Sequence, residues 1–357
     1  MEINKSTDVL VIGAGPLGVE CSANLKINNI DHILVDAGCL GNTILKWDNN
    51  THFLSTPDRL EIAEIPFQSV DQNSPTGQAY LSYLRNVVEI FDLPLYTYHK
   101  VTNINNLGNK GFVVKLSHKN ITYQLQVKRI ILASGGMNEL SKMGVEGEEY
   151  NFVHSNENID HKYFRKKILV VGDGNSAIEK AIRSFRIGAD VSLLIQQDHL
   201  DPEKVRFEYL REIRLLIEKE KIRLISKAQI EKITEDATCL YKILGINYEE
   251  KFDFVVKCIG YNFNDTLLKQ AGVKLDEDRV PFYNTETMET NIPDVFLAGT
   301  VAGGLRDMDK LFIGTCHNHV EKIMNQLDSN SITKTGSPAN RKYTFKYEDV
   351  QFPPDEI

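Results

Sequence analysis

Residues 11–18 read VIGAGPLG and residues 170–177 read VVGDGNSA, so a glycine-patterned turn of one kind occurs twice in the chain. Each turn follows a short apolar, β-branched run of the kind that forms a buried parallel strand. The residues after each turn have the hydrophobic spacing of a helix. A strand, a tight turn and a helix make the first half of a βαβ unit. A duplicated βαβ unit is therefore the simplest account of this sequence.

The glycines of the first turn have separate physical tasks. Gly13 permits the tight turn, Gly15 opens the backbone to a pyrophosphate, and Gly18 lets the helix pack closely on the strand. The pyrophosphate then lies at the helix N-terminus, where free N–H groups and the helix dipole favour negative charge. Pro16 fits the first helical turn, because its missing N–H has no partner there. Asp36 ends the next predicted strand, about 20 residues on, where a carboxylate accepts hydrogen bonds from a ribose diol.

The second turn repeats this spacing with alanine as its third small residue, and it predicts a second dinucleotide site. Its following strand ends in LLIQQD, so Gln196 stands where an acid favours NAD and an arginine binds the 2′-phosphate of NADP. Glutamine has no charge to pair with a phosphate, which favours NADH over NADPH. Arg183 or Arg206 could still fold inward and reverse this preference. The residues predicted to bind the nicotinamide nucleotide are Gly172, Gly174, Asn175, Ser176, Ala177 and Gln196.

Two dinucleotide sites in one chain imply electron transfer from a nicotinamide to a second, tightly held dinucleotide. FAD is the obvious candidate, because a flavin accepts the hydride of a nicotinamide and passes on one or two electrons. The sequence therefore predicts an FAD-dependent oxidoreductase that uses NADH or NADPH.

The composition is that of an ordinary globular protein of 357 residues, with 42% hydrophobic and 25% charged residues. The formal net charge of −8 argues against a nucleic-acid partner, because phosphate binding needs clustered Lys and Arg. No apolar run reaches the ~18 residues of a membrane span, and the first one leads into the glycine turn rather than a signal peptide. We predict a cytoplasmic protein with a small-molecule acceptor and no nucleic-acid, membrane or metal partner.

The segments between and after the two turns predict further elements. QAYLSYLRNVVEIFDL has the spacing of a helix, and GFVVKLS, ITYQLQV and RIILASGG read as three strands. After the second turn, PEKVRFEYLREIRLLIEKE predicts a charged amphipathic helix with one solvated face.

Beyond the two turns, the chain contains in order ILVD, IILASGG, KCIGY and NTETMETNIPDVFLAGT. With these motifs it resembles the thioredoxin-reductase-like flavoproteins of the pyridine nucleotide-disulfide oxidoreductase superfamily, over about residues 7–328. The resemblance implies an α/β fold of two Rossmann-like domains, with a nicotinamide domain (139–258) inserted in a split FAD domain (1–138 and 259–330). A C-terminal tail (331–357) follows, and relatives of this kind imply a homodimer or larger homo-oligomer.

The same resemblance implies further FAD contacts. In the family, the strand of the last motif ends in Gly and usually Asp, which contacts the flavin ribityl chain, whereas this chain has Thr300. Val101 would meet the adenine through its backbone, and Gly135 lies in ASGG, where the chain crosses between domains. The residues predicted to bind FAD are Gly13, Gly15, Pro16, Leu17, Gly18, Asp36, Val101, Gly135, Gly299 and Thr300.

Within this group, THFLSTPDRLEIAEIPF and AGTVAGG look most like the bacillithiol disulfide reductases, which reduce a low-molecular-weight disulfide with NADPH and FAD. Two features depart from them. Leu17 stands where they have a cysteine implicated in catalysis, and Gln196 lies where they usually offer an arginine. Thioredoxin reductase needs a C-x-x-C before the second turn, and the corresponding NFVHSNENIDHKYF contains no cysteine. The expected acceptor is therefore small, with a low-molecular-weight disulfide as one candidate, and is reduced without a C-x-x-C.

Cys316, in GTCHNH, is the candidate catalytic residue. In the related enzymes this segment begins the last helix, whose N-terminus faces the flavin. A helix N-terminus lowers the pKa of a thiol, and His317 and His319 are close in sequence. The alternative is a buried, inert thiol.

Three other functions fit parts of the sequence. A thioredoxin-reductase-type ferredoxin–NADP reductase also lacks C-x-x-C, although the negative charge and the missing arginine pair count against it. A flavin monooxygenase also has two glycine turns, but its fingerprint places Gly where this chain has Tyr150. The third is a non-catalytic sensor that binds both nucleotides and reports redox state.

Overall fold

The structure is a computed structural model with two compact units. One unit comprises Met1–Leu45, Asn50–Asn138 and Phe263–Ile357, and the other comprises Lys46–Asn49 and Glu139–Asn262. The second unit thus interrupts the first in sequence. Most of the predicted C-terminal tail lies outside the described residues. The structure describes residues 6–47, 51–53, 55–70, 73–136, 139–155, 160–306 and 311–336.

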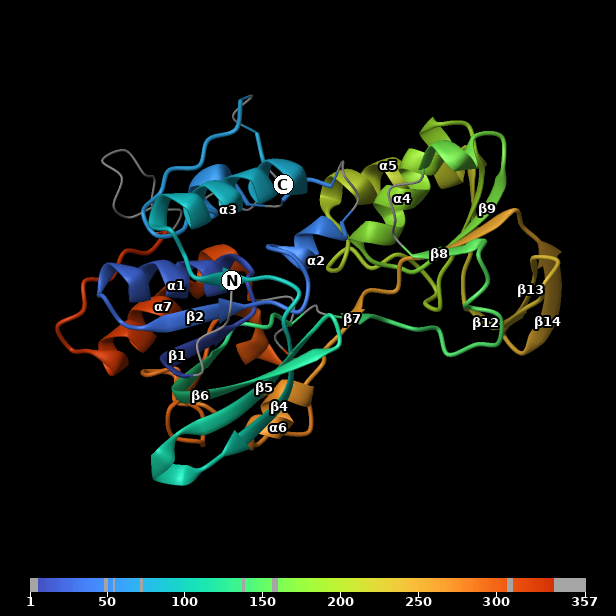
Figure 1. Ribbon diagram of the computed structural model, residues 1–357. Helices are drawn as coiled ribbons and strands as arrows, with labels where there is room; N and C mark the ends of the chain where they lie inside the picture. The colour runs from blue at the N-terminus through green and yellow to red at the C-terminus, as the bar shows by residue number, and fades with distance from the viewer. Residues whose placement is uncertain are drawn as a thin grey trace. The chain divides into compact units, whose positions relative to one another are not determined.

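The first unit is built on a seven-stranded mixed sheet (Figure 1). Its strand order is β3-β2-β1-β6-β5-β4, and β17 pairs in parallel with β6. ITYQLQV and RIILASGG, expected as two strands, form the single strand β6, whose first half pairs with β5 and whose second half pairs with β17. The strands are β1 (Ser6–Ile12), β2 (His32–Val35), β3 (Leu95–Tyr96), β4 (Lys100–Asn106), β5 (Phe112–His118), β6 (Ile121–Leu132) and β17 (Val295–Leu297).

Helix α1 (Pro16–Ile27) is the most deeply buried helix of this unit. Every residue from Leu17 to Leu25 is buried, because α1 packs against α3, α7 and β2 (Figure 1). In the described part of the chain, no helix is both long and apolar enough to cross a bilayer. The other helices and 3-10 turns are α2 (Asn42–Leu45), α3 (Gly77–Phe91), α6 (Thr266–Ala271), α7 (Ile313–Leu327), η1 (Pro57–Arg59), η2 (Gly108–Lys110) and η4 (Gly299–Gly303).

The predicted helix QAYLSYLRNVVEIFDL is confirmed as α3, and its aromatic side chains fix the segment that follows η1. The hydroxyl of Tyr80 donates to the carbonyl oxygen of Leu60 at 2.8 Å. The hydroxyl of Tyr83 accepts the N–H of Ile62 at 2.8 Å, and the Phe67 ring packs 4.7 Å from the Tyr83 ring. These contacts set the path of the backbone beside α1.

The second unit has a parallel five-stranded sheet, β11-β10-β9-β15-β8, and a small antiparallel sheet, β12-β13-β14. Side chains of β9 alternate between two cores: Ile168 and Val170 pack with residues of α4 and α5, and Leu169 and Val171 pack with the antiparallel sheet. The elements are β7 (Glu139–Leu140), β8 (Val153–Ser155), η3 (Asp160–Tyr163), β9 (Lys167–Val171), α4 (Asn175–Arg186), β10 (Asp190–Leu194), α5 (Phe207–Glu218), β11 (Ile222–Ile225), β12 (Ala228–Ile233), β13 (Thr238–Ile243), β14 (Ile246–Lys251), β15 (Phe254–Lys257) and β16 (Tyr261–Asn262).

We expect replacement of Asp160 to destabilise the second unit. Asp160 lies 2.7 Å from the ammonium of Lys180, whose side chain is 1% exposed, and 2.5 Å from the guanidinium of Arg183. Asp160→Ala removes the carboxylate that compensates the buried charge of Lys180. The free energy of unfolding, measured in urea, should therefore fall by about 3 kcal/mol. Asp198→Ala is the control, because its ion pair with Lys227 is exposed on both sides and should contribute little. Equal effects of the two variants would contradict this prediction.

Candidate dinucleotide-binding sites

The first glycine turn joins β1 to α1, and its three glycines differ in what surrounds them. Gly13 has φ +110°, and a Cβ there would lie 2.4 Å from the carbonyl oxygen of Ala133. A Cβ at Gly18 would lie 1.8 Å from the carbonyl oxygen of Gly13. At Gly15, in contrast, a Cβ would meet no atom within 4 Å. Packing within the protein explains the first two glycines but does not explain Gly15.

The second glycine turn, between β9 and α4, has the same backbone geometry. A Cβ at Gly172 would lie 2.2 Å from the carbonyl oxygen of Cys258, and one at Gly174 would meet nothing within 4 Å. The N–H groups of Gly13 and Gly172 donate to the last residues of β2 and β10, at 2.8 and 3.0 Å. The two turns are therefore structural duplicates.

Both turns fit a pyrophosphate. Gly15 and Gly174 are the N-caps of α1 and α4, and neither helix has a side-chain cap or an acid in its first turn. The free N–H groups of a helix N-terminus attract an anion, and the open space beside each glycine leaves room for one. Pro16 and Leu17 are the first two residues of α1, and Asn175, Ser176 and Ala177 are the first three of α4.

Asp36 lies directly after β2 and orients the first turn. Its two carboxylate oxygens accept the N–H groups of Ala14 and Gly38, each at 2.7 Å. Its carbonyl oxygen accepts the N–H of His99 at 2.8 Å, so the chain that leads to Val101 in β4 passes beside Asp36. Asp36 and Val101 thus lie near each other, and their contacts with a nucleotide stay predictions.

The chain at the end of β17 meets the first turn. Thr300 Oγ1 accepts the N–H of Gly136 at 2.8 Å, next to Gly135, which has φ +79°. Gly299 has φ +81°, and a Cβ there would lie 3.2 Å from the Cβ of Leu17. The structure therefore brings together four of the predicted FAD residues from three separate parts of the sequence.

Cys316 lies in the first turns of α7 as predicted, but its pKa is raised rather than lowered. Its side chain is fully buried, and burial raises the pKa of the thiol to about 11. Burial also raises the pKa of Cys239 and Cys258 to about 12, and that of Cys21 further still. A buried, protonated thiol is a poor nucleophile, so the redox role predicted for Cys316 loses its physical basis.

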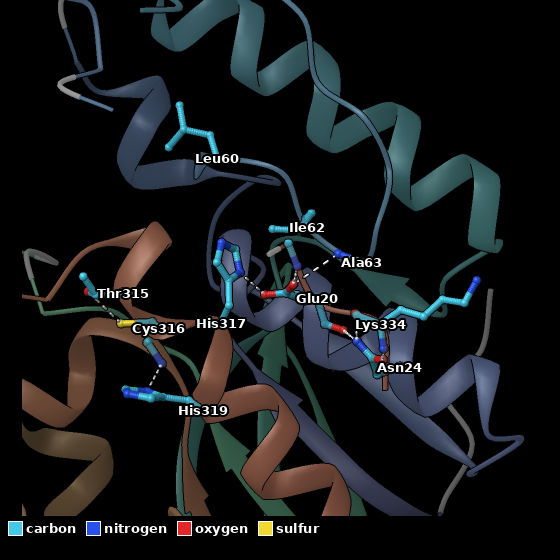
Figure 2. Close-up of polar contacts among 12 residues, drawn as sticks. Glu20, Asn24, Leu60, Ile62, Ala63, Thr315, Cys316, His317, His319 and Lys334 are labelled. Atoms are coloured by element: carbon cyan, nitrogen blue, oxygen red, sulfur yellow. Dashed lines mark hydrogen bonds and ion pairs between the residues drawn. The ribbon is translucent and has the colours of Figure 1, made fainter. Parts of the chain in front are cut away.

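Sequence reasoning missed a buried acid on α1. Glu20 is fully buried, and its Oε2 accepts a hydrogen bond from His317 Nδ1 of α7 at 2.8 Å (Figure 2). Its Oε1 accepts the N–H groups of Ala63 at 3.1 Å and Gly336 at 2.6 Å. Burial alone lowers the pKa of His317, but the hydrogen bond and the charge of Glu20 outweigh it and raise the pKa. An acid in the apolar helix VECSANL was the signal available in the sequence.

His319, two residues further along α7, contacts the predicted flavin site. Its Nδ1 accepts the N–H of Gly299 at 3.2 Å (Figure 2). Gly299 in turn lies close to Leu17. Burial lowers the pKa of His319 to about 4, which keeps the ring neutral and Nδ1 available as an acceptor.

The second predicted site lies at the end of β10 and the start of α4. Gln196 is exposed there, and Arg183 is engaged in the ion pair described above. The side chain of Asn175 donates to the carbonyl oxygen of Lys204 at 3.2 Å and accepts the N–H of Arg206 at 2.8 Å. These bonds place Arg206 beside the start of α4, and they explain why α5 begins later than the sequence predicted.

The chain matches the Pyridine nucleotide-disulphide oxidoreductase family over residues 10–299, and it belongs to that family. It is 30% identical over 305 residues to Bacilliredoxin reductase Bdr of Bacillus subtilis (strain 168). This alignment covers 85% of this chain and 92% of that protein. Solved structures of Bacillithiol Disulfide Reductase Bdr from Bacillus cereus and Staphylococcus aureus match it with TM-scores of 0.85 and 0.83, both at 26% identity. They cover 91% and 92% of this chain and 99% and 100% of theirs.

These comparisons confirm the predicted family and the α/β fold with two Rossmann-like domains. They also confirm an FAD-dependent oxidoreductase that resembles the bacillithiol disulfide reductases. The family implies FAD and a nicotinamide nucleotide as cofactors.

Two alanine substitutions should separate the folding role of the first turn from its binding role. Gly13→Ala places a methyl group against the Ala133 carbonyl at φ +110°, so the free energy of unfolding should fall by more than ~1 kcal/mol. Gly15→Ala places it in open space, so flavin-free stability should not change. FAD affinity of Gly15→Ala, measured by flavin fluorescence, should fall by about tenfold or more, the equivalent of about 1.4 kcal/mol. Wild-type affinity in Gly15→Ala would contradict the assignment of this turn.

Proposed function

We propose that this protein is an NADH-dependent reductase that passes electrons from FAD directly to a small acceptor, without a cysteine relay. The pair of open glycine turns, at Gly15 and Gly174, carries the proposal, because each leaves open space at an uncapped helix N-terminus, where a pyrophosphate can approach the backbone. The apolar Leu17 and the buried, protonated thiols support the absence of a relay.

Each residue of the first site has a distinct role in this proposal. The turn at Gly15 would bind the pyrophosphate, and the carboxylate of Asp36, which orients this turn, would accept a hydrogen bond from the ribose. Thr300 Oγ1 accepts the Gly136 N–H, so its own O–H donates to the ribityl chain. Leu17 presents an apolar surface that excludes water. A bound flavin supplies the capacity to accept a hydride and pass on one or two electrons.

A low-molecular-weight disulfide is the first acceptor to consider, because the similar solved structures are named bacillithiol disulfide reductases. Reduction of a disulfide consumes one hydride and one proton and yields two thiols. In those enzymes, which the sequence resembles, a cysteine stands at the position of Leu17. In this protein we propose that the acceptor meets the flavin itself, which admits other two-electron acceptors such as quinones.

An acceptor screen tests the proposal. Steady-state NADH oxidation with small disulfides, a quinone and ferredoxin should show turnover with a small acceptor and none that depends on ferredoxin. Cys316→Ala should stay within about twofold of the wild-type rate, because a buried, protonated thiol takes no part in the electron transfer. Leu17→Cys should raise disulfide reduction specifically, with quinone reduction as the internal control. Failure of NADH to bleach the flavin would favour the non-catalytic sensor.

Nucleotide preference should depend on Gln196. Wild-type protein should have a higher kcat/KM with NADH, because no charged side chain follows β10 directly to bind a 2′-phosphate. Gln196→Arg should raise kcat/KM for NADPH by about tenfold, the gain expected from a charge-assisted hydrogen bond to phosphate. Gln197→Arg, at the neighbouring exposed position, is the matched control. A hundredfold preference of the wild type for NADPH would overturn the assignment and direct attention to Arg206.

A further inference from the structure

Three polar side chains, Glu20, Asn24 and Asn28, follow one another at four-residue spacing along α1 and at its C-cap. Residues four apart share one face of a helix. Residues 331–336, which we call the C-terminal strap, lie along this face. Figure 2 shows Lys334 of the strap beside Asn24. The strap therefore adds hydrogen bonds to side chains that also bind within the unit, Glu20 to His317 and Ala63, and Asn24 and Asn28 to carbonyl oxygens of α1.

Two asparagines bind the strap through its backbone alone. Asn28 donates to the carbonyl oxygen of Ile332 at 2.9 Å and accepts its N–H at 2.8 Å. Asn24 makes the same pair of bonds with Lys334, at 2.8 and 2.6 Å. Each carboxamide thus gives one strap residue the donor and the acceptor that a neighbouring β-strand would otherwise provide.

The spacing of the two chains explains why the bonds repeat. Four residues of a helix advance about 6.0 Å, and two residues of extended chain advance about 6.6 Å. Every second strap residue can therefore meet every fourth residue of α1, and the strap runs antiparallel to the helix. Glu20 continues the series by accepting the N–H of Gly336 at 2.6 Å. A Cβ at Gly336 would lie 1.4 Å from the carbonyl oxygen of Glu61, so a glycine at this position fixes the register.

The contacts of Glu20 continue to the predicted flavin site. Glu20 binds His317 of α7 at 2.8 Å, and His319 binds the N–H of Gly299 at 3.2 Å. Gly299 in turn packs on Leu17, one turn before Glu20 on α1. Three contacts, Glu20–His317, His319–Gly299 and Gly299–Leu17, thus join α1, α7 and η4, and the strap donates a further hydrogen bond to the Glu20 carboxylate.

We propose that docking of the C-terminal strap sets the affinity of the flavin site, with Glu20 as the positioning residue that joins the two. The strap N–H at Gly336 and the imidazole of His317 hold the Glu20 carboxylate, and the carboxylate holds α1 against α7. Gly299, in η4, binds His319 of α7 and packs on Leu17 of α1 at the predicted flavin site, so this inference rests on the proposed function. Coupling between two sites is reciprocal, so bound FAD should in turn stabilise the docked strap and slow its amide exchange.

The charge on His317 makes the coupling sensitive to pH. His317 faces the carboxylates of Glu20 on α1 and Glu61 after η1, and the carbonyl oxygen of Arg59. Its pKa is raised in the folded protein, so the ion pair contributes fully below the unfolded value of about 6.5. The contribution is lost as the pH rises through the raised pKa. The strap should therefore loosen toward alkaline pH.

Gly336→Ala in the full-length protein tests this inference, with Thr335→Ala as the matched control. The added methyl group cannot fit beside Glu61, so the strap end should undock while the sheet stays intact. The dissociation constant for FAD should rise about tenfold, as expected when a buried charge loses a hydrogen bond, and should stay within about twofold in Thr335→Ala. Amide exchange of residues 332–336 should slow when FAD binds to the wild type, and it should be fast in Gly336→Ala. Exchange in the wild type should also quicken at alkaline pH, and Glu20→Gln should remove that dependence.

Two results would contradict the inference in different ways. Unchanged FAD affinity in Gly336→Ala, or strap exchange that does not respond to FAD, would overturn the coupling and leave the flavin function intact. A wild-type protein that takes up no FAD would overturn the proposed function and, with it, the coupling.

Discussion

The close approach of a strand-end carbonyl to a glycine Cα is the constraint on which both nucleotide sites depend. At Gly13 and at Gly172, the neighbouring carbonyl lies where any side chain would begin, 2.4 and 2.2 Å from an added Cβ. At both turns the backbone must therefore bend sharply after the strand, and the first N–H groups of the following helix have no side-chain cap. This turn leaves open space beside Gly15 and Gly174, through which an anion can reach the N–H groups at the start of each helix.

The two sites share this backbone and differ in their side chains, which is how one fold can bind two different nucleotides. In the first, Asp36 fastens the turn through Ala14 and Gly38, and the chain at Gly299 and Thr300 meets it from another part of the sequence. In the second, the corresponding strand ends without an acid. The first site thus has an acid that fixes its turn, and the second has the exposed Gln196 at the corresponding place.

The sequence alone predicted the fold class, the glycine turns and helix α3, because each depends on spacing within a short segment. It failed where distant segments decide the outcome. The pKa of Cys316 is governed by burial under the rest of the unit, which overrides the local effect of a helix N-terminus. Glu20 meets His317 from 297 residues away, and the strap meets α1 from more than 300, so no local pattern announced them. The polar residues Glu20 and Asn24 in the buried helix α1 indicated that some partner must meet them, but they could not indicate which one.

The electron capacity of the purified protein tests the central claim most directly. Anaerobic titration with NADH delivers two electrons per equivalent, and flavin absorbance reports when the flavin is fully reduced. If the flavin passes electrons to its acceptor without a thiol relay, one equivalent of NADH per bound FAD should bleach the flavin completely, and no more should be consumed. Consumption of a second equivalent would reveal a redox-active disulfide and contradict this account, and a protein that binds no FAD would contradict it altogether.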